Sequence, residues 1–208
     1  MKQGTEEWLQ ARCSLITASR IADVIATTKS GYAASRKNYL AELMVERMTG
    51  VPTDGFISPA MQWGTEHEPE ARAVYEFETD TNVVEVGFIV HPKYEYSGAS
   101  PDGLVGDAGM VEIKCPNSAT HIETLQSRSV PKRYFTQIQW GLECTGRRWC
   151  DYVSYDPRMK DSRLVMFCKR IELDESFLKG VRIEVEKAEA ELRALVESMT
   201  SIAGQKDG

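Results

Sequence analysis

The sequence has little of what marks membrane, secreted or thiolate-metal proteins. Its longest apolar runs are only a few residues, far short of the roughly 20 that a helix needs to cross a bilayer, and its first residues do not form a signal peptide. The five cysteines are widely spread and include no C-x-x-C pair, which argues against zinc or an iron–sulfur cluster. We therefore expect a cytoplasmic protein with reduced, mostly buried thiols.

Basic residues are also in the minority. The 208 residues include 25 Lys and Arg against 31 Asp and Glu, a formal net charge of −6, so this is not a protein that coats nucleic acid over its whole surface. DNA binding is still compatible with this charge, because it depends on the electrostatic field at the groove. With 42% apolar and 27% charged residues, the chain is a typical globular sequence, and its length favours one domain over residues 1–208.

Helical and strand patterns alternate in a way that predicts an α/β (α+β) fold with a central mixed sheet flanked by helices. Helical spacing, caps and Gly or Pro stops predict helices around Trp8, from Thr17, and over residues 35–48, 59–77, 118–126, 131–144 and about 174–200. Strands are predicted over residues 83–90, 97–99, 104–105, 110–115, 150–155 and 164–171. Residues 203–208 are expected to form a frayed tail. Pro69 should kink the 59–77 helix unless the helix restarts there.

The most informative local pattern is Ser100-Pro101-Asp102-Gly103 followed by Val111-Glu112-Ile113-Lys114. On a strand, residues two apart share a face, so Glu112 and Lys114 project to one side while Ile113 turns into the core. Asp102, in a Pro/Gly turn at a neighbouring strand end, can supply a second carboxylate to the same place. The pattern thus predicts two acids and an amine held side by side.

Two carboxylates and a backbone carbonyl suit a hard divalent cation such as magnesium. Such ions stabilise the attacking and leaving oxygens of phosphoryl displacement, roughly 3.5–4 Å apart when two are bound. The Lys114 ammonium could orient or help deprotonate the attacking water and offset phosphate charge. The E-x-K pair alone is also compatible with a solvated ion pair on a strand.

Two further positions stand out from helical spacing. Residues 17–20 are expected in the first turn of a helix, where free backbone N–H groups can receive an anion. Glu68 shares a face of the 59–77 helix with Ala71 and Tyr75, although a surface position is the usual one for a glutamate.

Seven stretches, all in the same order, carry a resemblance to a known family: residues 3–8, 15–19, 63–68 with 71–72, 100–104, 112–116, 137–139 and 155–160. Over residues 4–160 the chain resembles the family of lambda-type exonucleases and YqaJ-type viral recombinases, which are PD-(D/E)XK nucleases. The resemblance implies a restriction-endonuclease-like core with its catalytic centre at Asp102 and Glu112-Ile113-Lys114.

The resemblance also implies a role for each residue of that centre. Asp102, Glu112 and the carbonyl of Ile113 would hold magnesium, with two ions in the site and manganese as a substitute. Lys114 would serve the attacking water. Gln137 would steady that water or Lys114, and Glu68 would bind or orient the second metal region.

A terminal 5′-phosphate pocket is implied at Arg12, Ser19 and Ser100. This agrees with a guanidinium beside a helix N-terminus as an anion site. The family has an arginine a few residues after the position of Pro116, whereas residues 117–121 contain none. Thr120 or His121 is therefore expected to contact the phosphate instead, which leaves the 5′-phosphate dependence open.

Family resemblance further implies digestion of one strand of linear double-stranded DNA from 5′ to 3′, with mononucleotides released and a 3′ single-stranded overhang left for recombination by annealing. It implies a homotrimeric ring around the DNA and a phage-type single-strand annealing protein as partner, in a bacterial or phage-infected cell. Two alternatives stay open: a restriction-type endonuclease, which would cut closed circles, and a non-catalytic DNA-end-binding protein.

Overall fold

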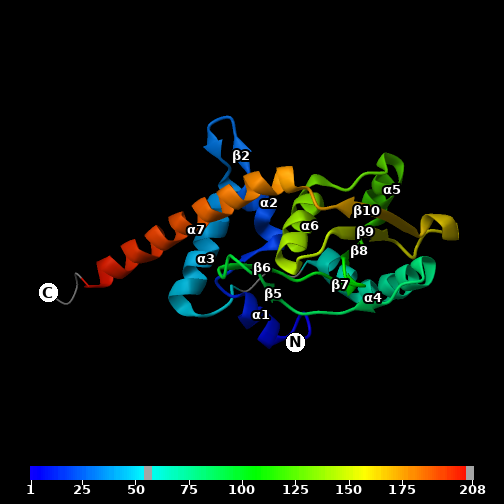
Figure 1. Cartoon of the computed structure of the whole chain (residues 1–208), viewed down its shortest axis with the longest axis horizontal. Coiled ribbons are helices and arrows are strands. Elements are labelled where there is room, and N and C mark those ends of the chain that lie inside the picture. Colours follow the sequence, from blue (N-terminus) through cyan, green and yellow to red (C-terminus); the bar gives the residue numbers. More distant parts are fainter. Residues whose placement is uncertain (54–57, 205–208) are drawn as a thin grey trace.

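A five-stranded mixed sheet forms the centre of the fold in the computed structural model, which describes residues 1–53 and 58–204. Its strand order is β10-β9-β8-β7-β4, with β8 and β9 parallel and the other neighbours antiparallel (Figure 1). The strands are β4 (Val83–Val84), β7 (Gly103–Val105), β8 (Gly109–Lys114), β9 (Trp149–Tyr155) and β10 (Met166–Glu172). The predicted central mixed sheet with flanking helices is thereby confirmed.

Helices cover both faces of this sheet (Figure 1). Helix α4 (Pro59–Thr79) packs on the face formed by the odd-numbered residues of β8 and β9, such as Ile113 and Val153. Helix α6 (Lys132–Thr145) packs on the even-numbered face, against Met110 and Tyr152. Because side chains alternate along a strand, Glu112 and Lys114 lie on the α6 side.

A second, three-stranded sheet brings the N-terminal segment to the end of β6. Its order is β1-β6-β5, with β1 (Ile16–Thr17) parallel to β6 (Ser97–Ala99) and β5 (Ile89–Val90) antiparallel to it. The short helices η1 (Ala18–Arg20) and α2 (Ile21–Val24) follow β1 directly. Strand β6 leads to Ser100 and Asp102, so this pairing places the start of η1 beside the predicted acid.

Three helices build the rest of the N- and C-terminal regions. Helix α1 (Glu6–Arg12) is capped by the Thr5 side chain, and α3 (Ala34–Thr49) ends at Gly50, whose φ of 69° is left-handed. Helix α7 (Glu175–Gly204) packs on the core beside α3 by the predicted apolar seam, with Leu192 fully buried and Val196 partly buried. The C-terminal part of α7 projects from the body (Figure 1).

The local elements differ from the prediction in several ways. Thr17 ends strand β1 where a helix was expected to begin, and the residues after it form only the short helices η1 and α2. Helix α4 continues through Pro69, because burial of Ala71 and Tyr75 holds it on the sheet despite the lost hydrogen bond. The predicted strand over residues 83–90 is divided between β4 and β5, in different sheets. An exposed hairpin, β2 (Thr27–Thr28) and β3 (Gly31–Tyr32), was not predicted. Residue 204 ends α7, and the rest of the predicted tail lies outside the described residues.

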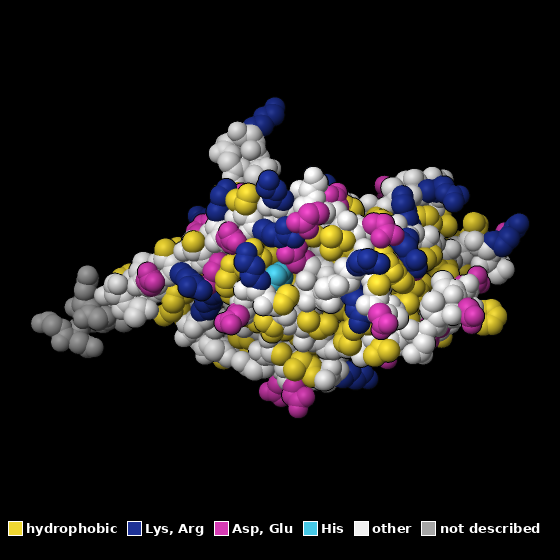
Figure 2. Space-filling model, in the orientation of Figure 1, with side chains coloured by type: hydrophobic (Ala, Val, Ile, Leu, Met, Phe, Trp, Pro, Cys, Tyr) yellow, Lys and Arg dark blue, Asp and Glu magenta, His cyan; other side chains and the backbone are white. Residues whose placement is uncertain are grey.

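Two further helices and the surface complete the description of the fold. Helix α5 (Ser118–Ser127) and the short helix η2 (Ser162–Leu164) complete the chain. The five cysteines form no disulfide with one another, and three of them are buried. Acidic and basic side chains are interspersed over the face shown in Figure 2. Within the described ranges, no helix has the length and apolar character needed to cross a membrane.

Candidate active site

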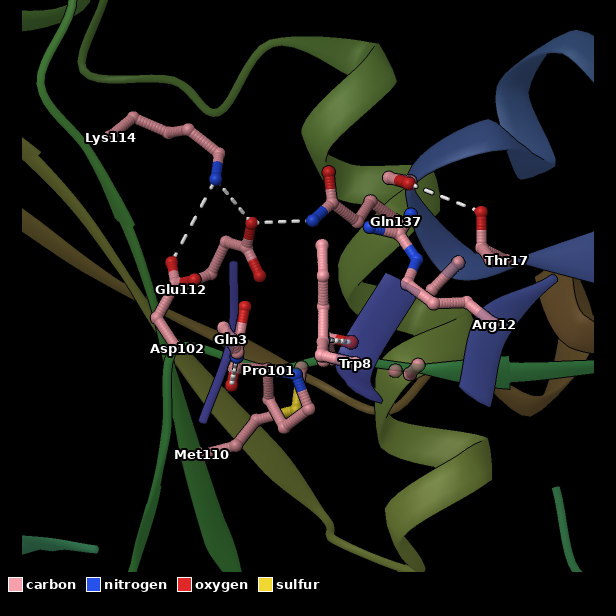
Figure 3. A pocket seen from close by; sticks show the side chains of 15 residues that line it. Gln3, Trp8, Arg12, Thr17, Pro101, Asp102, Met110, Glu112, Lys114 and Gln137 are labelled. Atoms are coloured by element: carbon pink, nitrogen blue, oxygen red, sulfur yellow. Dashed lines mark hydrogen bonds and ion pairs between the residues drawn. The ribbon is translucent and has the colours of Figure 1, made fainter. Parts of the chain in front are cut away.

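The predicted acid–amine cluster is assembled at the end of β8. The Lys114 Nζ lies 2.5 Å from Oε1 of Glu112 and 3.8 Å from Oδ2 of Asp102 (Figure 3). Asp102 stands in the turn before β7, and its Oδ2 accepts a hydrogen bond from the backbone N–H of Ile113 at 2.7 Å. This bond fixes the carboxylate from the neighbouring strand against β8.

Gly103 permits the close approach of this turn to β4. A Cβ at Gly103 would stand 2.1 Å from a methyl carbon of Val83, a distance that real side chains do not tolerate. Only a glycine therefore lets the strand that follows Asp102 pack at this distance.

Gln137 joins the cluster from α6. Its Nε2 donates to Oε1 of Glu112 at 2.5 Å, the same oxygen that contacts Lys114. The Glu112 side chain is only 2% exposed and that of Lys114 24%. The pair is thus shielded from water on the sheet side and reachable from one direction, through the pocket.

Burial shapes the protonation of these groups. Burial raises the pKa of Glu112, and the charge of Asp102 raises it further against the effect of Lys114. For Lys114, burial lowers the pKa, but the nearby carboxylates of Glu112 and Asp102 outweigh it and raise the pKa. The cluster therefore favours a positive charge close to its carboxylates.

Glu68 lies at the margin of the cluster. Burial and the charge of Asp102 raise its pKa to about 7, so the two carboxylates are close enough to interact. Arg72, one helical turn later on α4, donates to Oε1 of Glu68 at 2.6 Å and also pairs with Glu85 at 2.8 Å. The structure thus places Glu68 near Asp102, although it does not line the pocket that contains Lys114.

That pocket is a cavity of about 180 Å³ that joins the cluster to the N-terminal segment. Figure 3 shows Lys114, Glu112 and Asp102 at one side, Arg12 and Thr17 at the other, and Gln137 between them. The residues that line it are Gln3, Trp8, Arg12, Thr17, Ala18, Ser19, Ala99, Ser100, Pro101, Asp102, Met110, Glu112, Lys114, Gln137 and Gly141. The pocket therefore brings together three predicted residues from separate segments: Arg12, Ser19 and Ser100.

Arg12 is held in the wall of the pocket by stacking. Its guanidinium carbon lies 4.0 Å from the centre of the Trp8 ring, and the Trp8 indole N–H donates to Oγ of Ser100 at 2.9 Å. Burial lowers the pKa of Arg12. Among the described residues no carboxylate lies within 4.0 Å of its guanidinium. An unpaired, partly desolvated guanidinium beside the start of η1 is suited to bind an anion.

The donor set fits a hard divalent cation. The carboxylate oxygens of Asp102 and Glu112 both lie near one cationic group, the Lys114 ammonium. Oxygen atoms that share one cation in this way are the type of ligand that magnesium binds. Across the described residues, no group of three acidic, histidine or cysteine side chains forms a complete ligand cage. A metal here would thus need the backbone carbonyl of Ile113 or water as further donors, as magnesium sites commonly have.

Thr120 and His121 do not lie in the pocket, and the expectation that His121 contacts a phosphate is wrong. His121 is fully buried, with its ring nitrogens 2.8 Å from Oγ of Ser154 and 2.8 Å from the carbonyl oxygen of Leu164. Thr120 is in the first turn of α5, where its N–H donates to the Asn117 side chain at 2.9 Å. The His121 side chain belongs to the packing of α5 on β9, and Thr120 lies outside the residues that line the pocket.

Sequence reasoning gave no role to two residues that shape the pocket. Gln3 donates through Nε2 to the carbonyl oxygens of Pro101, at 2.8 Å, and Val86, at 3.2 Å. Trp8 supports both Arg12 and Ser100. Both residues lie in the first of the stretches that carry the family resemblance, and that stretch was the available signal.

Comparison with known proteins agrees with this geometry. The family model described as the YqaJ-like viral recombinase domain matches residues 7–148. A search of curated proteins gives no match. An alkaline exonuclease from Laribacter hongkongensis, LHK-Exo, is 50% identical, with a TM-score of 0.89 over 97% of this chain and 99% of that chain.

Two further structures are similar. The crystal structure of LHK-Exo in complex with dAMP is 49% identical, with a TM-score of 0.90 over 97% of this chain and 99% of that one. A phage-related exonuclease from Haemophilus somnus 129PT shares the fold at 13% identity, with a TM-score of 0.72 over 89% of this chain and 96% of that chain. The chain belongs to the YqaJ-like viral recombinase domain family.

Proposed function

We propose that this nuclease is a magnesium-dependent exonuclease that digests one strand of linear double-stranded DNA in the 5′ to 3′ direction, releases mononucleotides and leaves a 3′ single-stranded overhang for annealing. Family membership and 50% identity to an alkaline exonuclease support the nuclease activity. The 5′ to 3′ polarity and the product are proposed from the family resemblance, and the magnesium dependence from the resemblance together with the two carboxylates of the site.

One observation carries the exonuclease proposal: a single cavity joins the Lys114 cluster to Arg12. At about 180 Å³ it is smaller than the roughly 300–1,000 Å³ of pockets that enclose a drug-sized ligand, so a terminal nucleotide suits it better than an intact duplex. A 5′-phosphate on Arg12, Ser19 and Ser100 would leave the next phosphodiester at the catalytic side. The dAMP complex of the 49% identical LHK-Exo supports a mononucleotide product.

Asp102, Glu112 and the Ile113 carbonyl would hold one magnesium ion, and Glu68 would bind or orient a second. Bound there, the ions would supply Lewis-acid stabilisation of the scissile phosphate and activation of water. Manganese, which accepts the same oxygen ligands, is expected to substitute.

Lys114 and Gln137 act on the water and the phosphate. The Lys114 ammonium, 2.5 Å from Oε1 of Glu112 and 3.8 Å from Oδ2 of Asp102, is suited to orient or help deprotonate the water and to offset phosphate charge. The Gln137 amide holds Glu112 Oε1 at 2.5 Å and leaves its carbonyl oxygen free to accept from water or from Lys114.

Hydrolysis assays test this proposal. Wild type and Lys114→Ala are incubated with linear duplex and with closed circular DNA in magnesium, manganese or chelator. Mononucleotides should appear from the linear duplex alone and be lost in the variant and in chelator. Cleaved circles would favour a restriction-type endonuclease, and end binding without hydrolysis in any metal would favour a non-catalytic end-binding protein.

Polarity has its own test. Phosphorothioate linkages at both 5′ termini should block digestion, because the nonbridging oxygens of the first phosphodiesters are replaced, whereas the same linkages at the 3′ termini should not. Protection by 3′ linkages alone would contradict the 5′ to 3′ direction.

Family likeness also supports a homotrimeric ring around the DNA and an annealing protein that binds the exposed strand. Light scattering of the full chain should give three times the monomer mass, and a stable monomer would contradict the ring. A single-strand annealing protein should co-purify with the trimer, and its failure to bind at micromolar concentrations would contradict that partnership.

A further inference from the structure

Ser14 has an unusual backbone in the segment that carries Arg12. Its φ of 69° is left-handed, a conformation that non-glycine residues keep only when their surroundings hold it. It follows Arg12 and Cys13 at the end of α1, and one residue, Leu15, separates it from β1. The turn therefore connects the helix of Arg12 to the strand that leads to Ser19.

Glu46, near the end of α3, holds this turn. Its Oε2 accepts a hydrogen bond from the backbone N–H of Ser14 at 2.6 Å, and its Oε1 accepts from the backbone N–H of Thr53 at 2.9 Å. A carboxylate that binds a backbone amide makes a charge-assisted bond, roughly twice as strong as a neutral one. Both oxygens are thus used to hold two loops at the end of α3.

Arg47, the next residue, anchors the same place to α7. Its guanidinium donates to the carbonyl oxygen of Ser14 at 3.4 Å and to Oε2 of Glu189 at 2.5 Å. The Glu189 side chain is only 5% exposed and also accepts from Arg193 Nε at 2.6 Å. Glu189 is therefore a buried acid with no part in the proposed chemistry. It holds the Arg47 guanidinium, which in turn bonds the carbonyl oxygen of Ser14.

Both sides of the anion-binding end of the pocket depend on this turn. Arg12 is the last residue of α1, and its carbonyl oxygen accepts from the N–H of Leu15 at 3.1 Å. Ser19 follows Ser14 by five residues, and its hydroxyl oxygen lies 3.3 Å from that of Thr17. A change in the backbone at Ser14 would alter the separation between the guanidinium and the hydroxyls.

We propose that Glu46 is a positioning residue for recognition of the DNA end. By holding Ser14 in its left-handed conformation, Glu46 sets the spacing between Arg12 and Ser19 and thereby the preference for a 5′-phosphorylated end. Arg47 and Glu189 anchor the same turn to α7. This inference rests on the proposed phosphate pocket. It adds a specificity-determining contact that lies outside the pocket itself.

The test compares 5′-phosphorylated and 5′-hydroxyl duplexes by equilibrium binding without metal and by kcat/KM with magnesium. Because Glu46→Ala displaces the Arg12 guanidinium but leaves it present, it should lower the preference for the phosphorylated end several-fold, up to the roughly tenfold effect of losing a charged hydrogen bond. Glu46→Gln keeps one acceptor oxygen and should be intermediate. Ser14→Gly keeps the N–H and tolerates positive φ, so its preference should stay within about twofold of wild type.

Glu184→Ala is the matched control. It removes a glutamate of α7 that accepts from the Tyr32 hydroxyl at 2.6 Å, away from Arg12, and should leave the preference unchanged. Loss of activity on both ends in equal proportion by Glu46→Ala would show a general structural role and overturn the proposal, as would an unchanged preference. A wild type that binds both ends equally would overturn the phosphate pocket itself and the inference with it.

Discussion

Gln137 and Lys114 share one carboxylate oxygen: each places a nitrogen 2.5 Å from Oε1 of Glu112. One donor comes from α6 and the other from β8, so the orientation of the buried acid depends on the packing of that helix on the sheet. An isolated E-x-K pair on a strand would lack this second restraint.

Removal of the Gln137 amide should therefore impair catalysis. Residues that orient metal-ligating carboxylates typically contribute about 10- to 100-fold to activity, and we expect Gln137→Ala to lower kcat by this factor with little change in KM. Gln62→Ala, at an exposed glutamine of α4 that bonds Glu66, serves as the control. A kcat equal to wild type would show that Gln137 has no part in the reaction.

Lys114 should compete with metal for the same carboxylates. Its ammonium lies 2.5 Å from Glu112 and 3.8 Å from Asp102, so Lys114→Met should bind magnesium or manganese several-fold more tightly because the competing positive charge is gone. Hydrolysis should be lost in the same variant. Titration calorimetry measures the affinity, with Lys132→Met, an exposed residue, as the control, and weaker metal binding would contradict the competition.

Arg12 should contribute to end recognition more than to the chemical step. Arg12→Ala removes the unpaired guanidinium that stacks on Trp8, and we expect its kcat/KM on phosphorylated ends to fall by about tenfold or more, the usual effect of losing a charged hydrogen bond. On hydroxyl ends kcat/KM should fall much less. An equal loss on both kinds of end would assign Arg12 a structural role.

His121 should affect stability rather than DNA binding. Its ring nitrogens engage Ser154 and Leu164 in the interior, so His121→Ala would leave buried polar groups without partners and destabilise the fold by about 2–4 kcal/mol. Denaturant unfolding measures this change, while Thr120→Ala should stay within about 0.5 kcal/mol of wild type. A His121 variant with normal stability and weakened end preference would restore the original expectation.

Asp156 should give the protein a stability that depends on acid pH. Burial opposes ionisation of this carboxylate, which is 0% exposed, but hydrogen bonds from Arg158 and Ser118 lower its pKa to about 2, from an ordinary 3.8. The ionised group therefore stabilises the folded state above pH 3.8, and this stabilisation is lost as the pH falls towards 2. The free energy of unfolding of wild type should exceed that of Asp156→Asn at pH 7, and the difference should shrink between pH 4 and 2. A difference that is constant with pH would contradict this assignment.

Much of the catalytic cluster could be predicted from the sequence, because its geometry is local. Glu112 and Lys114 share a face through the period of the strand, and Asp102 is delivered by a neighbouring turn. The residues proposed to bind phosphate are different: Arg12 and Ser100 meet only because β1 pairs with β6 in parallel, and local spacing does not encode that pairing. Family resemblance supplied it.

Errors arose where tertiary packing decided the outcome. His121 faces β9 rather than the pocket because of how α5 lies on the sheet, and the sequence of α5 alone does not reveal that direction. The β-rich stretch over residues 83–90 pairs in two different sheets, a division that strand propensity does not predict. Ser14 has no local signal at all, since a serine is an uncommon choice for a left-handed position.

The small volume of the pocket has a practical consequence for DNA ends that carry attached groups. If the proposed phosphate-binding and hydrolytic residues act in this one cavity of about 180 Å³, a terminal phosphate esterified to a bulky dye, a cap or a protein would not enter. Such adducts should act as roadblocks to this nuclease, and DNA molecules sealed in that way would keep both strands intact in its presence.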